Sequence, residues 1–299
     1  MKKDEILVTV NMASYNHEKY IRQALDSVLM QEVSFRYEIL ITDDASTDGT
    51  AEIIKEYAQK YPDIIRGICR KRNVGPMTNG IYRHSHANGK YIACLECDDY
   101  WIDKRKLQQQ IDFLEMHPEY SVCYTNAGVI RDNTNVVHFA KRDLGSLDEY
   151  LANGKKGISI PVATMVYRNI FHDNPQLIDC YKTNKLIGDR ITQVLLFRYG
   201  KYKYLPIRSA VYRHIKKGGS SFTSMGEMTK WEDAVPCFRM CIKISPDKNK
   251  EAWYVILSEV QRKIIQTIVK EKGFGAAFEY YIKNLKIKEK YYLSKEHWT

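Results

Sequence analysis

The sequence predicts an α/β protein with a mostly parallel central sheet flanked by helices, followed by a helical C-terminal extension. Short apolar runs alternate three times with segments of helical periodicity before residue 91, a pattern typical of parallel strands joined by right-handed crossovers. From about residue 230 the pattern is mostly helical. The 299 residues are 44% hydrophobic and 27% charged, so the chain can bury a sizeable core.

Four buried strands are expected in the first part of the chain, each followed by a helix. Asn16 is the expected N-cap of the first helix, Pro62 ends the second, and Asp103 caps the fourth. The expected strands are residues 6–12, 37–42, 64–69 and 91–95, and the expected helices are residues 17–31, a segment ending near 61, 77–87 and 103–117.

The rest of the chain is less regular. We expect strands at 120–129 and 162–167, a polar irregular insertion at 131–160, a helix at 191–199, an extended segment at 203–214 and a mobile glycine-rich loop at 216–225. The main domain should therefore comprise residues 1–226, in two halves of residues 1–126 and 127–226. Residues 227–299 should form the helical extension.

The cysteines and the hydropathy pattern favour a cytoplasmic protein. Seven cysteines without the spacing of a disulfide framework are expected to be reduced thiols. Cys94 and Cys97 should point to opposite faces of a strand, which suits neither a redox pair nor a zinc site. The sequence shows neither a signal-peptide core nor an apolar run of 18 residues.

Basic residues are unevenly distributed along the chain, whose formal net charge is +10. Residues 181–230 contain eleven Lys or Arg and two acidic residues, so an anion is expected to meet this region. A nucleotide diphosphate, a phospholipid surface and a nucleic acid are the candidates. In the tail, Phe274, Phe278, Ile282 and Leu285 fall at helical spacing among lysines, which suits packing on the domain or contact with a membrane surface.

Polar residues follow each of the first four expected strands. The carboxyl ends of parallel strands meet at one edge of a sheet, where open α/β sheets bind ligands. Glu96, Asp98 and Asp99 follow the fourth strand and would suit a hard divalent cation, although a solvated turn is the alternative. The other three sites are Ser14-Tyr15-Asn16, Asp43-Asp44 and the turn from Arg70 to Gly75.

These four sites, in this order, resemble the motifs of the family 2 glycosyltransferases, which have the GT-A fold. The likeness covers residues 6–126 strongly and 160–222 weakly. It rests on Ser14-Tyr15-Asn16, Ser27-Val28-Leu29-Met30-Gln31, the run from Asp43 to Thr50, Asn73 with Gly75, and Glu96 to Asp99. Glu96 stands where the family usually has Asp, so the role of Glu96 is open.

The resemblance implies a nucleotide-sugar-binding half at 1–126 and an acceptor half at 127–226. Tyr15 would stack on the base, Asp44 would accept a hydrogen bond from a uracil or thymine N–H, and Asp98 would hold the ribose. Asp99 would bind Mn²⁺ or Mg²⁺. The residues expected to contact the nucleotide sugar are Ser14, Tyr15, Asn16, Asp44, Arg70, Asn73, Gly75 and Asp98.

The resemblance also implies a catalytic base and a second candidate metal ligand. Asp189, in Gly188-Asp189-Arg190, occupies the place of the family's base, although by itself it would suit a helix cap. His214 would complete the metal site or be structural. Asp44 would also suit a turn former, and Arg70 a solvated loop charge.

The sequence therefore favours an inverting, metal-dependent transferase that moves a sugar from a UDP-sugar, or a dTDP-sugar, to an acceptor hydroxyl. The implied acceptor is a glycan or a lipid-pyrophosphate-linked sugar in bacterial capsular, exo- or lipopolysaccharide synthesis, at or near an anionic membrane. A dehydrogenase would need G-x-G-x-x-G after the first strand, and a nucleic-acid-binding protein would need a recognition module. Neither is present. A sugar-nucleotide-binding protein without turnover stays open.

Overall fold

The computed structural model describes residues 5–131, 138–139, 146–154, 160–186, 188–215 and 226–295. The strands in this part of the chain are β1 (Ile6–Ser14), β2 (Arg36–Asp43), β3 (Ile65–Cys69), β4 (Tyr91–Glu96), β5 (Tyr100–Trp101), β6 (Tyr120–Arg131), β7 (His138–Phe139), β8 (Val166–Arg168) and β9 (Lys201–His214). The helices are α1 (Ile21–Leu29), α2 (Thr50–Lys60), α3 (Pro76–His86), α4 (Lys106–Met116), α5 (Leu147–Gly154), α6 (Ile170–Asp173), α7 (Asp189–Leu196), α8 (Glu227–Ile244) and α9 (Asp247–Lys295), with 3₁₀ helices η1 (Val162–Thr164) and η2 (Pro175–Tyr181).

The described strands form one nine-stranded sheet in the order β3-β2-β1-β4-β8-β6-β9-β5, with β7 paired to β6. The first four strands of this order are parallel, as predicted, and β6 and β9 are also parallel. The pairings of β4 and β6 with β8, and of β5 with β9, are antiparallel. The fold class is confirmed, and the carboxyl ends of β1 to β4 lie at the same edge of the sheet.

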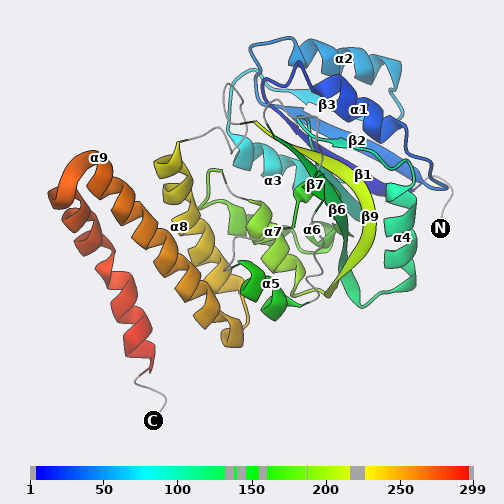
Figure 1. Ribbon diagram of the computed structural model, residues 1–299. Helices are drawn as coiled ribbons and strands as arrows, with labels where there is room; N and C mark the ends of the chain where they lie inside the picture. The colour runs from blue at the N-terminus through cyan, green and yellow to red at the C-terminus, as the bar shows by residue number, and fades with distance from the viewer. Residues whose placement is uncertain are drawn as a thin grey trace.

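Helices cover both faces of the sheet (Figure 1), and a hydrophobic core lies on each face. One contains the apolar faces of α1, α2 and α4, and the other contains those of α3, α6 and α7 together with α8 and α9. Cys97 is buried in the first core and Cys94 packs against the second, so the two thiols lie on opposite faces as predicted. All seven cysteines are free.

The first helix begins at Ile21, not at residue 17, and Asn16 is not its N-cap. Asn16 has a positive φ of 55°, and its Oδ1 accepts a hydrogen bond of 2.8 Å from the Thr47 N–H. Its own N–H donates to Ser46 Oγ, and the next N–H, of His17, donates to Thr50 Oγ1. These bonds join the loop after β1 to the loop after β2 and hold both in place. Helix α1 therefore begins four residues later than predicted.

The acceptor half differs from the prediction in several elements. The segment expected to be a strand at 162–167 is the 3₁₀ helix η1 followed by the three-residue strand β8. The helix expected at 191–199 begins at Asp189 and ends at Leu196. Part of the segment expected to be irregular forms β7 and α5. The mobile loop expected at 216–225 lies outside the described residues.

Buried polar side chains around Lys106 connect helix α4 and strand β5 to η1. Lys106 is 0% exposed, its Nζ donates a 2.7 Å hydrogen bond to Gln110 Oε1, and its ammonium lies over the Trp101 ring. Burial lowers the pKa of Lys106 to about 7. Gln110 Nε2 donates to the Thr164 carbonyl, and Trp101 Nε1 donates to the Ala163 carbonyl. Satisfied buried polar groups of this kind restrict a segment to one position.

Helices α8 and α9 pack against the body of the protein. Trp253 of α9 is 0% exposed and belongs to the same core as residues of α6 and α7. At Gly273 the backbone has a φ of 83°, and the chain reverses so that the last part of α9 runs back alongside the first (Figure 1). Among the described residues, no helix is long and apolar enough to cross a membrane. The division into domains at residue 226 stays a prediction.

Candidate active site

A cavity of about 330 Å³ lies at the carboxyl ends of β1, β2 and β4. We call it the nucleotide pocket, after the nucleotide contacts that the sequence predicts for several of the residues lining it. Five of the eight residues predicted to contact a nucleotide sugar line it, namely Ser14, Tyr15, Asp44, Asn73 and Asp98. The residues that also line it, and that the sequence did not single out, include His17, Thr42, Asn79, Arg83 and Leu186. The sheet therefore brings together side chains as far apart in the sequence as Ala13 and Tyr212.

Asp44 holds the turn between β3 and α3. Its two carboxylate oxygens accept hydrogen bonds of 2.8 Å and 2.9 Å from the N–H groups of Val74 and Gly75. Asn73 Oδ1 also accepts from the Gly75 N–H, and Gly75 has a φ of 86°, which a glycine adopts without strain. Each carboxylate oxygen has a second lone-pair direction, so Asp44 can still accept a hydrogen bond from a ligand.

Three predicted contact residues do not line the nucleotide pocket. Asn16 joins the two loops described above, and the N–H of Gly75 is used by Asp44. Arg70 donates a 2.6 Å hydrogen bond from Nε to Asn79 Oδ1, and its guanidinium lies over the Tyr82 ring. Asn79 lines the pocket and Arg70 does not, so Arg70 supports the pocket through its hydrogen bond to Asn79. The proposed direct contacts of these three residues stay predictions.

Glu96, Asp98 and Asp99 form an acidic cluster after β4, with one oxygen from each carboxylate within 4.8 Å of the others. Asp98 and Asp99 are 3% and 1% exposed, whereas the Glu96 side chain is open to the cleft. Burial and the charges of Asp98 and Glu96 raise the pKa of Asp99 well above its usual range. Desolvation by the surrounding protein raises the pKa of Glu96 to about 8, although part of its side chain is accessible to water. The negative charges of Asp98 and Asp189 act in the same direction.

This cluster fits a hard divalent cation. Three carboxylates so close together repel one another when ionised, and a cation removes that repulsion. Carboxylate oxygens are ligands that Mg²⁺ and Mn²⁺ prefer. Asp99 is held in place because its Oδ1 accepts a 2.8 Å hydrogen bond from the Arg213 N–H. His214, next along β9, does not join this cluster, and its Nδ1 is buried without a hydrogen-bond partner.

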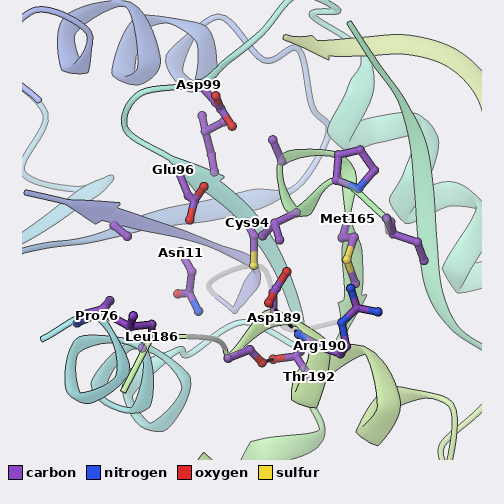
Figure 2. A pocket seen from close by; sticks show the side chains of 18 of the residues that line it. Asn11, Pro76, Cys94, Glu96, Asp99, Met165, Leu186, Asp189, Arg190 and Thr192 are labelled. Carbon is purple, nitrogen blue, oxygen red and sulfur yellow. Dashed lines mark hydrogen bonds between the residues drawn. The ribbon is translucent and has the colours of Figure 1, made fainter. Parts of the chain in front are cut away.

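A second cavity of about 710 Å³, which we call the central pocket, continues from the nucleotide pocket between the sheet and helices α3, α7 and α8. Figure 2 shows Glu96, Asp99 and Asp189 around it. Asp189 is the first residue of α7, and its Oδ1 accepts a 2.8 Å hydrogen bond from the Arg190 N–H. The structure therefore places the predicted base across the pocket from the predicted metal ligands.

Arg83 is the most prominent site residue that the sequence did not indicate. It lines both pockets, and its Nη1 donates a 2.6 Å hydrogen bond to Thr42 Oγ1. Burial lowers the pKa of Arg83, and the Coulombic interactions with Cys94, Cys97 and Glu96 oppose that effect. A basic residue in the last turn of a helix usually complements the helix dipole, so only its fixed place beside two pockets identifies Arg83.

His84 makes the stability of the fold depend on pH. Its Nδ1 lies 2.9 Å from the Gly80 carbonyl and its Nε2 lies 3.0 Å from the Tyr167 hydroxyl, which suits a neutral ring that donates to one and accepts from the other. Burial, followed by the charge of Arg83, lowers the pKa of His84 to about 4. Between pH 6.5 and about 4, His84 is therefore protonated in the unfolded chain and neutral in the folded protein.

We expect the free energy of unfolding to fall as the pH drops from 6.5 to 4, by at most roughly 3 kcal/mol from this residue. Urea unfolding at several pH values measures the slope. His84→Gln should flatten it, and His86→Gln, an exposed histidine on the same helix, should not. An unchanged slope in His84→Gln would assign the acid sensitivity to other groups.

Residues 9–174 match the sequence model of Glycosyl transferase family 2, which is more than half of the chain. The chain belongs to glycosyl transferase family 2. Rv1520 of Mycobacterium tuberculosis, an uncharacterised protein, is 35% identical over 272 residues, covering 87% of this chain and 74% of Rv1520. TuaG of Bacillus subtilis, a glycosyltransferase provisionally assigned to teichuronic acid biosynthesis, is 37% identical over 108 residues, covering 36% of this chain and 42% of TuaG.

Solved structures of other glycosyltransferases share the fold of this family 2 protein. Staphylococcus aureus TarS 1–349 in complex with UDP is similar with a TM-score of 0.58 at 17% identity, covering 89% of this chain and 73% of that one. The mannosyltransferase PcManGT of Pyrobaculum calidifontis, in complex with GDP-Man and Mn²⁺, has a TM-score of 0.56 at 15% identity, covering 95% and 80%. The predicted GT-A fold and the assignment as a glycosyltransferase are confirmed.

Proposed function

We propose that this family 2 glycosyltransferase is an inverting, metal-dependent enzyme that transfers a sugar from a nucleoside diphosphate donor, with UDP favoured, to an acceptor hydroxyl. One observation carries the proposal. The acidic cluster lies where the nucleotide pocket meets the central pocket, and Asp189 lies in the central pocket. A donor seated on the cluster would present its sugar to an acceptor beside Asp189.

The nucleotide pocket supplies the donor contacts. Tyr15, at 36% exposure, offers a ring face on which a base can stack. Asp44 is held by two backbone N–H groups at the floor of the pocket, where it can accept the ring N–H of uracil or thymine but finds no donor on cytosine. Asp98 would accept hydrogen bonds from the ribose hydroxyls. Bound UDP in TarS supports a uridine donor, while GDP-Man in PcManGT is the alternative.

Asp99, with Glu96 or Asp98 beside it, would hold Mn²⁺ or Mg²⁺. When bound, the cation would act as a Lewis acid that stabilises the charge of the departing nucleoside diphosphate. Mn²⁺ bound by PcManGT supports this assignment. The backbone N–H of Arg213 donates a hydrogen bond to Asp99 Oδ1 and so orients this carboxylate. His214 stays a second candidate ligand.

Asp189 would act as the general base. The acceptor oxygen forms a bond to the anomeric carbon while the bond from that carbon to the phosphate oxygen breaks. The acceptor's proton passes to the Asp189 carboxylate, and the nucleoside diphosphate leaves with the electron pair of the broken bond. One displacement inverts the anomeric configuration, and a positioned base lowers its barrier. Asp189 is exposed to the pocket, so an acceptor hydroxyl can reach it.

The proposed acceptor is a glycan or a lipid-pyrophosphate-linked sugar in bacterial surface-polysaccharide synthesis. The provisional assignment of TuaG to teichuronic acid biosynthesis supports this class. Apolar side chains of η1 and α8, together with Met77 of α3, line much of the central pocket, which suits an acceptor that has an apolar part. We place the enzyme in the cytoplasm, in keeping with seven free thiols and the reducing conditions there.

A thermal-shift panel tests the nucleoside and the metal together. We expect UDP with Mn²⁺ to raise the melting temperature by several degrees, dTDP to do so less, and UDP without a cation to act weakly. The reason is mass action, since a ligand that binds only the native state stabilises it. Stabilisation by GDP alone would transfer the nucleoside assignment to guanine. Binding without turnover for any acceptor would instead favour the alternative, a catalytically silent sugar-nucleotide-binding protein.

We also propose that the last part of α9 contacts an anionic membrane surface. Phe274 and Phe278, four positions apart on the helix, are 81% and 64% exposed, while Ala277 between them in the sequence is 3% exposed. Large apolar side chains therefore face solvent and a small one faces the core. Lys270 and Lys272, just before the reversal at Gly273, are also exposed, and basic residues near exposed phenylalanines suit contact with a charged lipid surface.

Vesicle sedimentation tests this contact. Phe274→Ser combined with Phe278→Ser should weaken binding to phosphatidylglycerol vesicles by about tenfold or more, because each lost phenyl side chain forfeits roughly 1.5–3 kcal/mol of apolar burial. Binding should also weaken as salt rises. Met116→Ser, at a side chain 69% exposed on α4, is the control and should bind normally. Equal vesicle binding by the double phenylalanine variant and by Met116→Ser would exclude Phe274 and Phe278 as the membrane contact.

A further inference from the structure

Asn11, in the middle of β1, is a buried amide without a hydrogen-bond partner. It is 5% exposed, and neither Oδ1 nor Nδ2 has a partner. The residues before and after it on the inner strand, Val10 and Met12, are 0% exposed and point to the opposite face. A buried amide without a hydrogen-bond partner costs free energy for each unsatisfied group, so this position makes the fold less stable than an apolar residue would.

The Asn11 side chain borders the central pocket. Figure 2 shows it pointing from β1 toward Pro76 and Leu186, and both of these residues line the nucleotide pocket as well. Asn11 therefore lies on the side of the central pocket where the nucleotide pocket enters it. Asp189 enters the same space from the start of α7.

The strand register fixes the depth of Asn11 relative to the acidic cluster. Ala13 pairs with Glu96, and Asn11 pairs with Cys94 two residues earlier on the same face. At about 3.3 Å per residue, Asn11 lies roughly 6.6 Å further into the pocket than Glu96. Arg83 bonds to Thr42, which pairs with Ala13, so the guanidinium lies near the level of Glu96.

We propose that Asn11 and Arg83 bind the sugar of the nucleotide-sugar donor, in the part of the central pocket next to the nucleotide pocket. This inference rests on the proposed function. A sugar joined to a diphosphate at the acidic cluster would enter the central pocket past Arg83 and meet Asn11 on the side where the two pockets join. An amide both donates and accepts, as a sugar hydroxyl does, while a guanidinium only donates.

The test compares UDP with UDP-glucose, UDP-galactose and UDP-N-acetylglucosamine, all with Mn²⁺, by calorimetric titration. Asn11→Leu replaces the amide by an apolar group of similar size. We expect its affinity for UDP to stay within twofold of wild type, and its preference for the best UDP-sugar over UDP to fall by about tenfold. Without ligand its melting temperature should rise by roughly 2–4 °C, because two unpaired polar atoms are gone.

Thr9→Val is the matched control. Thr9 lies two residues earlier on the same face of β1 and is 0% exposed, but its hydroxyl donates to Glu38 and accepts from the Gly89 N–H. Thr9→Val should melt at a lower temperature than wild type and keep the wild-type preference for UDP-sugar over UDP. Asn11→Leu with an unchanged preference, or with a lower melting temperature, overturns the proposal. So does a wild type that binds every UDP-sugar no better than UDP. Failure of wild type to bind any nucleotide would instead refute the proposed function itself.

Discussion

Asp189→Asn should lower turnover by roughly 10²–10⁴-fold, the usual contribution of a general base, and leave donor affinity within a few-fold of wild type. The substitution removes basicity and keeps shape. The asparagine Oδ1 can still accept the hydrogen bond that Asp189 receives from the Arg190 N–H, so the start of α7 should be unchanged. Steady-state transfer rates, combined with calorimetric titration of the donor, separate the two effects.

Asp179→Asn is the comparison variant for this experiment. Asp179 is an exposed carboxylate whose Oδ1 lies 2.5 Å from Lys182 Nζ, and it does not line the central pocket. Near-normal turnover is expected for it. Parallel loss of donor binding and turnover in Asp189→Asn would make Asp189 structural. Loss of turnover in Asp179→Asn alone would identify a different base.

Asp99→Asn should abolish the rise in melting temperature that Mn²⁺ gives with UDP, and should lower activity at least about 100-fold, since several kcal/mol of charge stabilisation are lost. In the absence of cation, the same variant should melt at a higher temperature than wild type near pH 8. The physical reason is that one of three crowded carboxylates no longer ionises. The Arg213 N–H can still donate to the asparagine oxygen.

The control for Asp99→Asn is Asp112→Asn, which removes an exposed carboxylate from α4. It should change neither the response to Mn²⁺ nor the melting temperature by more than a degree or two. Asp99→Asn with a normal Mn²⁺ response would mean that Glu96 and Asp98 hold the cation without it. Differential scanning fluorimetry at two pH values, with and without Mn²⁺, distinguishes these results.

The parallel part of the sheet was predictable because its strands are long apolar runs that alternate with amphipathic helices. That alternation placed the ends of β1 to β4 at one edge, and so placed Asp44 and Asp98 in one pocket. The short strands were predicted poorly. β5, with two residues, was missed, and only the end of the strand expected at 162–167 falls in the three-residue β8, because so few residues show no period. The start of α1 was missed because Asn16 is held by Ser46 and Thr47, about thirty positions away.

Two site residues escaped the sequence for another reason. Arg83 resembles any basic residue in the last turn of a helix, and Asn11 interrupts an apolar strand without a motif around it. Their significance depends on what surrounds each side chain, a pocket for one and missing hydrogen-bond partners for the other. The sequence motif predicted that Glu96 belongs to the site. It could not predict that Glu96 lies near Asp189, because that contact forms only when the two halves of the chain pack together.

The network around Lys106 gives one wall of the central pocket the rigidity of a hydrophobic core. Ala163 lines that wall, and its carbonyl is tied through Trp101 to a helix on the other face of the sheet. A bound acceptor therefore cannot push this wall aside without breaking buried hydrogen bonds. Room for acceptors of different size has to come from the facing wall, formed by α7 and α8. We expect relatives that have diverged in the acceptor they use to differ mainly in those two helices.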